Sequence, residues 1–171
     1  MFSFFFPSNI FNLLEKLIKF INSIFFIFLT IGLTFALVIS PPDYLQGESV
    51  RIMYVHVPSS WIGLACYLAI AIMSVLNFVF KIKIFTLINK CIAPIGLLFT
   101  CLSVITGSIW GKPTWGTLWV WDARLTSMLV LMFFYIFYIL SLKLIESKNI
   151  SLKVSTFIAI IGSLNIPIIK Y

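Results

Sequence analysis

The chain has 171 residues, of which 61% are hydrophobic and only 10% are charged. Soluble domains carry roughly 25% charged residues because their surface faces water, so this composition excludes a water-soluble globule and indicates an integral membrane protein. Its 12 Lys and Arg outnumber its 5 Asp and Glu, yet the positive charges stand singly or in pairs between apolar runs. That pattern is typical of loops between membrane spans and does not indicate nucleic-acid binding.

Five windows are long and apolar enough to cross a bilayer, which takes about 20 residues in a helix. They cover about residues 21–39, 61–80, 91–110, 125–142 and 150–169. No internal repeat or linker divides the sequence. We therefore predict an all-α polytopic membrane protein with five transmembrane helices, two functional outer loops and a single membrane domain over residues 1–171.

The distribution of Lys and Arg predicts which side each loop faces, because the inner loops carry the excess of positive charge. With the N-terminus inside, the outer segments hold only Arg51, Lys112, Arg124 and Lys170. The inner segments and span ends then hold Lys16, Lys19, Lys81, Lys83, Lys90, Lys143, Lys148 and Lys153. We expect the N-terminus in the cytoplasm or matrix, and segments 40–60 and 110–124 outside.

The first outer segment, residues 40–60, contains His56, the only histidine of the protein. We expect residues 50–57 to form a short helix or strand that ends before Pro58, and Ser59 or Ser60 to cap the second span. His56 would then lie near the outer surface. It is either a hydrogen-bonded loop or core residue or, as a neutral imidazole, a ligand of a metal, haem iron included.

The second outer segment, residues 110–124, holds four of the five tryptophans: Trp110, Trp115, Trp119 and Trp121. An interfacial aromatic belt accounts for one or two of them at a span end. Gly111 and Gly116 remove side chains beside the indoles, and Trp115 and Trp119 share a face if the segment is helical. Such a platform, edged by Lys112 and Arg124, suits a flat apolar ligand with anionic groups, such as haem. Another amphipathic ligand, a lipid headgroup and a purely structural belt stay open.

The sequence contains no catalytic constellation, since one His and five acids form neither a Ser/His/Asp set nor a metal-ligand cluster. A carrier is therefore expected rather than an enzyme. The cysteines, Cys66, Cys91 and Cys101, form no CxxC motif and are expected to be small buried hydrophobic residues. Two other functions stay open, a transporter of haem or another small solute and a structural subunit of a respiratory membrane complex. The absence of ionisable residues from the middle of the spans disfavours the transporter.

Two segments resemble a known family. The string WGKPTWGTLWVWDARLTS, residues 110–127, resembles the tryptophan-rich WWD motif of cytochrome c biogenesis haem handlers, in the form found in cytochrome c maturation protein C, also called haem exporter protein C. Residues 46–58 resemble the first outer loop of the same family, and the resemblance covers about residues 30–171. The WWD motif also occurs in larger haem lyases, which the short length and the residues flanking the motif disfavour.

The resemblance implies haem binding and delivery at the outer face of the membrane for cytochrome c maturation. The bound group would be haem b, held transiently and presented to the haem chaperone, cytochrome c maturation protein E, together with ABC-transporter-like subunits. By motif match, His56 is an axial ligand of the haem iron. The matching haem platform consists of Trp110, Gly111, Trp115, Gly116, Trp119, Trp121, Asp122 and Arg124. Asp122 and Arg124 either pair with each other or meet haem or the chaperone.

The sequence departs from the family pattern at its end. Members have six spans, with a second axial histidine in the outer loop after the fifth, whereas this sequence ends at Tyr171. We expect a separately encoded C-terminal fragment to supply the sixth span and the second histidine; an incomplete sequence or an altered function with one ligand are the alternatives. The 18 Phe, with abundant Ile, Lys and Asn, indicate AT-rich coding as in organelle genomes. We expect the mitochondrial inner membrane, or alternatively the bacterial plasma membrane.

Overall fold

The computed structural model describes residues 7–170, and the side chains of residues 11–169. Within that part the structure consists of helices and turns, with no strand beyond one isolated bridge. Five helical segments are long and apolar enough to cross a membrane: Phe11–Ile39, Glu48–Phe80, Ile84–Trp115, Ala123–Leu144 and Lys148–Ile169. The prediction of an all-α polytopic membrane protein with five spans is confirmed, although the first three segments begin well before the predicted windows.

The chain divides into two compact units at Pro41 and Pro42. The first unit is a single long helix, α1 (Pro7–Thr34), which continues into the π-helical turn η2 (Phe35–Ile39). Its apolar side chains are exposed on every side, from Phe11 to Ile39. A helix that is hydrophobic all round suits lipid or the flanks of other membrane helices.

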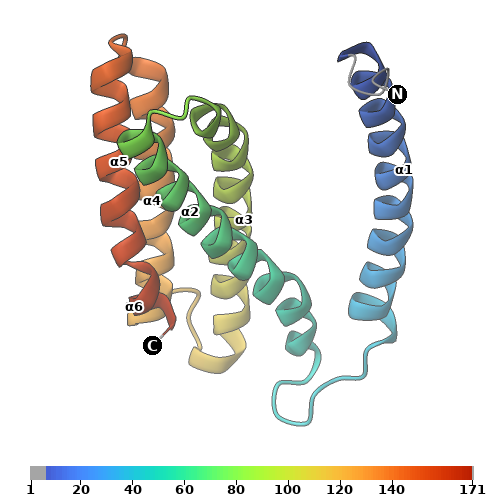
Figure 1. The fold of residues 1–171 in the computed structure, drawn as a ribbon. Coiled ribbons are helices and arrows are strands. Elements are labelled where there is room, and N and C mark those ends of the chain that lie inside the picture. The colour runs from blue at the N-terminus through green and yellow to red at the C-terminus, as the bar shows by residue number, and fades with distance from the viewer. Residues whose placement is uncertain (1–6, 171) are drawn as a thin grey trace. The chain divides into compact units, whose positions relative to one another are not determined.

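The second unit is a bundle of four long helices, α2 (Met53–Phe80), α3 (Ile84–Trp115), α4 (Ala123–Leu144) and α5 (Lys148–Leu164). Two short helices complete it, η3 (Glu48–Ile52) before α2 and α6 (Ile166–Lys170) after α5. Helix α2 packs against α3 and α5, and α4 packs against α3, α5 and α6. Figure 1 shows that α2 begins, α3 ends and α4 begins at the same end of this bundle. The residues predicted to form the site are therefore brought to one end.

Buried tyrosines hold the middle of the bundle together. The Tyr135 hydroxyl donates to the Gly63 carbonyl over 2.7 Å, and the Tyr67 hydroxyl donates to the Ile158 carbonyl over 3.0 Å. The two rings meet edge to face, with centroids 4.8 Å apart. Gly96 lets the Tyr135 ring lie directly against α3, where a Cβ would overlap it. Because lipid offers no hydrogen-bond partner, each buried hydroxyl needs one inside the bundle.

A polar cluster ties the four helices together toward the opposite end. The Asn89 side-chain amide donates to the Ser74 hydroxyl over 3.1 Å, and Ser74 and Tyr138 hydroxyls lie 3.2 Å apart. Thr156 donates to the Ser74 carbonyl over 3.4 Å. Side-chain hydrogen bonds of this kind stabilise helix association in a bilayer. They fix α2, α3, α4 and α5 against one another independently of the predicted site.

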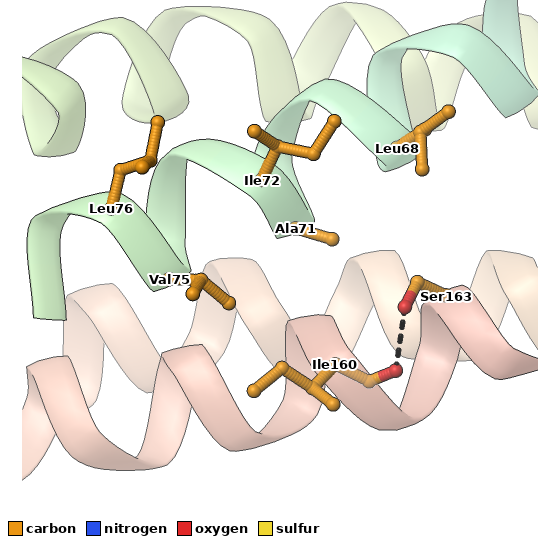
Figure 2. Close-up of a pocket in the computed structure, with 7 residues that line it drawn as sticks. All are labelled: Leu68, Ala71, Ile72, Val75, Leu76, Ile160 and Ser163. Carbon is orange, nitrogen blue, oxygen red and sulfur yellow. Dashed lines mark hydrogen bonds between the residues drawn. The ribbon is translucent and has the colours of Figure 1, made fainter. Parts of the chain in front are cut away.

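Two further features lie away from the site. The cysteines are free, but they are not buried, and the prediction that they are buried is wrong. Cys91 is exposed, and Cys66 and Cys101 are half-buried. An apolar groove of about 410 Å³ lies between α2 and α5. Figure 2 shows its lining side chains, among them Ser163, whose hydroxyl donates to the Ile160 carbonyl over 2.7 Å. The groove is lined by Leu68, Ala71, Ile72, Val75, Leu76, Ile160 and Ser163. At 1.5 Å per residue it begins about 18 Å along α2 from His56, and it offers no charged group to a ligand.

Candidate functional site

His56 lies in the first turns of α2 rather than in a loop. The 3₁₀ turn Glu48–Ile52 runs directly into α2, so the helix is already established upstream and continues through Pro58. The predictions that residues 50–57 end before Pro58 and that Ser59 or Ser60 caps the span are therefore wrong. The Ser60 hydroxyl instead donates to the His56 carbonyl over 2.9 Å. An N-terminal helical turn gives His56 a fixed backbone.

Hydrogen bonds to α3 determine which nitrogen of His56 is free. Nδ1 lies 3.0 Å from the Ser103 carbonyl oxygen and 3.1 Å from Thr106 Oγ1. A carbonyl only accepts, so Nδ1 carries the hydrogen and donates it. In the neutral imidazole Nε2 is then unprotonated, and no hydrogen bond within the described part of the chain reaches it. This is the tautomer in which Nε2 can bind a metal, with Nδ1 oriented by an acceptor.

Small residues of α3 let the imidazole approach this closely. A Cβ at Gly107 would lie 2.8 Å from His56 Cε1 and 3.3 Å from Nδ1, so any larger side chain would displace the ring. One turn away, the Ser60 and Ser103 hydroxyls are 2.6 Å apart and link α2 to α3. This support was not predicted from the sequence. Its signal is a buried small-residue face on α3 with spacings of three and four, typical of close helix packing: Gly96, Thr100, Ser103, Gly107 and Gly111.

Trp110 lies beside the imidazole. The two ring centroids are 5.9 Å apart and the planes are inclined by 47°. The Trp110 indole N–H donates to Gln46 Oε1 over 3.0 Å. Gln46 belongs to a tight turn in which Asp43 Oδ1 accepts from its backbone N–H over 2.9 Å and Gly47 adopts φ +57°. The turn before η3 thus holds the indole that faces His56.

Helix α3 includes the first part of the tryptophan-rich segment and ends at Trp115. Gly116 follows in the left-handed conformation, φ +73°, and its N–H donates to the Lys112 carbonyl over 2.9 Å. The Trp115 ring lies over Gly111, where a Cβ would be 2.7 Å away. Residues 110–115 are therefore helical rather than part of a loop, and the location of the segment outside the membrane stays a prediction. Trp119 lies beyond the helix, so the two indoles at 115 and 119 do not share a helical face.

The non-helical residues 116–122 carry the second indole pair. Trp119 and Trp121 meet edge to face with centroids 5.6 Å apart. Trp121 is 79% exposed, whereas Trp119 Nε1 is buried and has no partner in the part of the chain that the structure describes. A buried indole N–H without a partner is an available donor. No ring contact between this pair and Trp110 is found among the described residues.

Asp122 and Arg124 have separate positions. Asp122 is the N-cap of α4, and its Oδ1 accepts from the Leu125 N–H over 2.6 Å. Arg124 is exposed in the first turn, and no ion pair with Asp122 is found within residues 11–169. Residues two apart on a helix do not face each other. The cap interaction takes the place of the pairing considered from the sequence.

The donor set fits a haem better than a bare metal ion. The chain has one histidine, and the described residues contain no group of three or more His, Cys, Asp or Glu that could hold a metal. A macrocycle already supplies four nitrogens and needs only axial ligands. His56 offers one such nitrogen next to an indole face, and Lys112 and Arg124 are exposed cations suited to carboxylates.

Comparison with known proteins gives consistent matches. The model of the family described as "Heme exporter protein C" matches residues 1–171. A ccmC-like mitochondrial protein of cytochrome c biosynthesis from Marchantia polymorpha is 48% identical over 133 residues, 78% of this chain and 56% of that protein. "Heme exporter protein C" of Escherichia coli K12 is 41% identical over 143 residues, 84% of this chain and 58% of that protein. The Haemophilus influenzae protein of the same name is 39% identical over 165 residues, which are 96% of this chain and 67% of that protein. The chain thus spans somewhat more than half the length of the first two relatives.

Proposed function

The chain belongs to the haem exporter protein C family, and from this premise we propose that it binds haem transiently and delivers it for cytochrome c maturation. One observation carries the proposal. His56 donates its Nδ1 hydrogen to α3, which leaves Nε2 free beside the Trp110 ring at one end of the bundle. A half-buried neutral imidazole with its Nδ1 hydrogen bonded in this way is the state that a haem ligand requires.

Each part of the site has a proposed role. His56 supplies one axial nitrogen to the iron of haem b. The indoles and glycines of the tryptophan-rich segment form the haem platform, Asp122 holds the start of α4 in place, and Arg124 with Lys112 pairs with the propionates. The platform residues are Trp110, Gly111, Trp115, Gly116, Trp119, Trp121, Asp122 and Arg124. Trp119 Nε1, buried without a partner in the described part, is a donor that a haem propionate could satisfy.

The second axial ligand comes, in this proposal, from outside the 171 residues, because the chain has a single histidine. A segment outside these 171 residues, with a sixth span and an exposed histidine, would supply it. The proposed recipient is the haem chaperone of cytochrome c maturation, with ABC-transporter-like subunits as further partners. One relative is a mitochondrial protein and others are bacterial, and of these settings we propose the mitochondrial inner membrane, with the N-terminus inside and the tryptophan-rich segment outside.

A transporter with an ion-coupled path is less well supported. Besides tyrosines, the polar residues buried in the described part are Ser, Thr and Asn, and no Asp, Glu, Lys, Arg or His is buried there. Coupled transport usually leaves an ionisable side chain at mid-membrane. A purely structural subunit would need neither the free Nε2 nor the close approach of His56 to Gly107.

Haem titration of the purified 171-residue chain in detergent tests the proposal. We expect the wild-type chain to bind haem with a five-coordinate or weakly six-coordinate spectrum, since it supplies one imidazole. His56→Ala should shift the Soret band and weaken retention, whereas Ser108→Ala, a hydroxyl bonded within α3, should change neither. Identical spectra and affinity for wild type and His56→Ala would refute the ligand assignment.

A further inference from the structure

We propose that Thr106 is a positioning residue for His56. The Thr106 hydroxyl keeps the imidazole in the tautomer and orientation that direct Nε2 to the iron. The inference rests on the proposed role of His56 as a haem ligand and adds a residue outside the tryptophan-rich segment. Thr106 lies one turn before Trp110 on α3, 50 residues from His56 in the sequence. Its side chain contacts the ring nitrogen opposite the one that would bind iron.

The hydroxyl of Thr106 is oriented by its own helix. It donates to the Leu102 carbonyl over 2.6 Å, and a second acceptor, the Ser103 carbonyl, lies 3.3 Å away. Its single hydrogen is therefore committed to the backbone, and the lone pairs of Oγ1 face His56 Nδ1 at 3.1 Å. Thr106 Oγ1 can only accept from the imidazole. Together with the Ser103 carbonyl at 3.0 Å, it gives the Nδ1 hydrogen two acceptors.

The backbone bond alone does not distinguish Thr106, because threonines in helices commonly donate to the carbonyl four residues earlier. Thr100, also on α3, donates in the same way to the Gly96 carbonyl over 2.8 Å. Of these two threonines, only Thr106 also forms a hydrogen bond with the imidazole. Two acceptors on Nδ1–H fix the ring plane and raise the basicity of Nε2, which strengthens its bond to ferric iron more than to ferrous iron. Thr100 is therefore a control on the same helix with the same internal bond.

The test compares Thr106→Val, Thr106→Ser and Thr100→Val in the full 171-residue chain. Thr106→Val keeps the shape but removes the acceptor, and it should weaken ferric haem binding about tenfold, the low end for outer partners of a metal ligand. The midpoint potential of the bound haem should rise, because the ferric form loses more. Thr106→Ser should restore both values, and Thr100→Val should match wild type in both. A loss of affinity shared by Thr106→Val and Thr100→Val would overturn the proposal, since it would report helix packing.

Chemical rescue gives an independent measurement that does not depend on the folding of Thr106→Val. In His56→Gly, added imidazole can bind iron and also donate N–H to Thr106 and Ser103, whereas 1-methylimidazole can bind iron but cannot donate. Imidazole should restore the wild-type Soret band at an at least tenfold lower concentration. Equal rescue by the two compounds would overturn the proposal.

The outcomes separate this inference from the proposed function. If His56→Ala binds haem as wild type does, the ligand assignment fails and Thr106 loses its role with it. If His56→Ala loses haem while Thr106→Val keeps wild-type affinity and potential, only the positioning role is refuted.

Discussion

Replacing Gly107 by Ala tests whether His56 acts from the position that the α2–α3 packing gives it. A Cβ at Gly107 would lie 2.8 Å from His56 Cε1, whereas ordinary van der Waals contact begins at 3.4 Å, so the ring must retreat by about 0.6 Å. A binding constellation tolerates displacements of about 0.5 Å. Disturbing the support of a metal ligand costs roughly 10–100-fold in affinity. We expect Gly107→Ala to weaken haem binding within that range.

The stability of the haem-free chain should change little in the same variant. Weaker hydrogen bonds of Nδ1 lower the free energy of unfolding by about 1 kcal/mol. Replacing Gly by Ala inside a helix raises it by roughly 0.5–1 kcal/mol, so the two effects nearly cancel. Haem titration followed at the Soret band, with thermal unfolding by circular dichroism, separates the two effects. Gly32→Ala is the matched control, because a Cβ there meets nothing within 4 Å. Wild-type affinity and spectrum in Gly107→Ala would show that the observed ring position is not the one that binds haem.

Three further changes probe the neighbouring parts of the site. Gln46→Leu removes the acceptor of the Trp110 N–H; it should alter tryptophan fluorescence and weaken haem binding several-fold, whereas Gln46→Glu, which keeps an acceptor, should bind almost normally. Replacing Trp115 and Trp119 together by Ala should cost about 1–3 kcal/mol of haem binding, or roughly five- to 150-fold in affinity, and an unchanged haem signal per folded protein would instead support a structural belt. Asp122→Ala should lower the free energy of unfolding by about 0.5–2 kcal/mol through loss of the α4 cap, and Asp122→Asn, which retains a cap, should unfold as wild type does; equal losses in both would mean that the charge itself is needed.

The spans could be predicted from the sequence because a bilayer selects for long apolar runs, whatever their partners. Their ends could not, since a helix continues beyond its apolar run when its backbone hydrogen bonds remain satisfied. Pro58 illustrates this: it was predicted to end a segment, and it lies inside α2, as Pro113 lies inside α3. In membrane helices an internal proline does not have to end the helix, because side chains and neighbouring helices satisfy the backbone groups that it frees.

His56 and the tryptophans could be singled out because their residue types are rare and their chemistry is specific. The residues that hold them could not, because Ser103 and Thr106 reach His56 across 47 and 50 residues. That contact exists only after α2 and α3 pack, and small residues are ambiguous in a membrane helix, where they also serve ordinary packing. Because one small-residue face serves both purposes, the recognisable sequence motif begins only at Trp110, while the residues that support it extend back along α3.

The two halves of the site therefore have different physical foundations. His56 and Trp110 lie on packed helices, and their hydrogen bonds to Ser103, Thr106 and Gln46 fix them before any ligand arrives. Trp119 and Trp121 lie on the non-helical connection to α4. A ligand nitrogen must be placed accurately to bind iron, whereas stacking on an indole tolerates small shifts. For a protein proposed to take up haem and release it again, this division keeps the iron ligand constant and leaves the adjustment to the segment between α3 and α4.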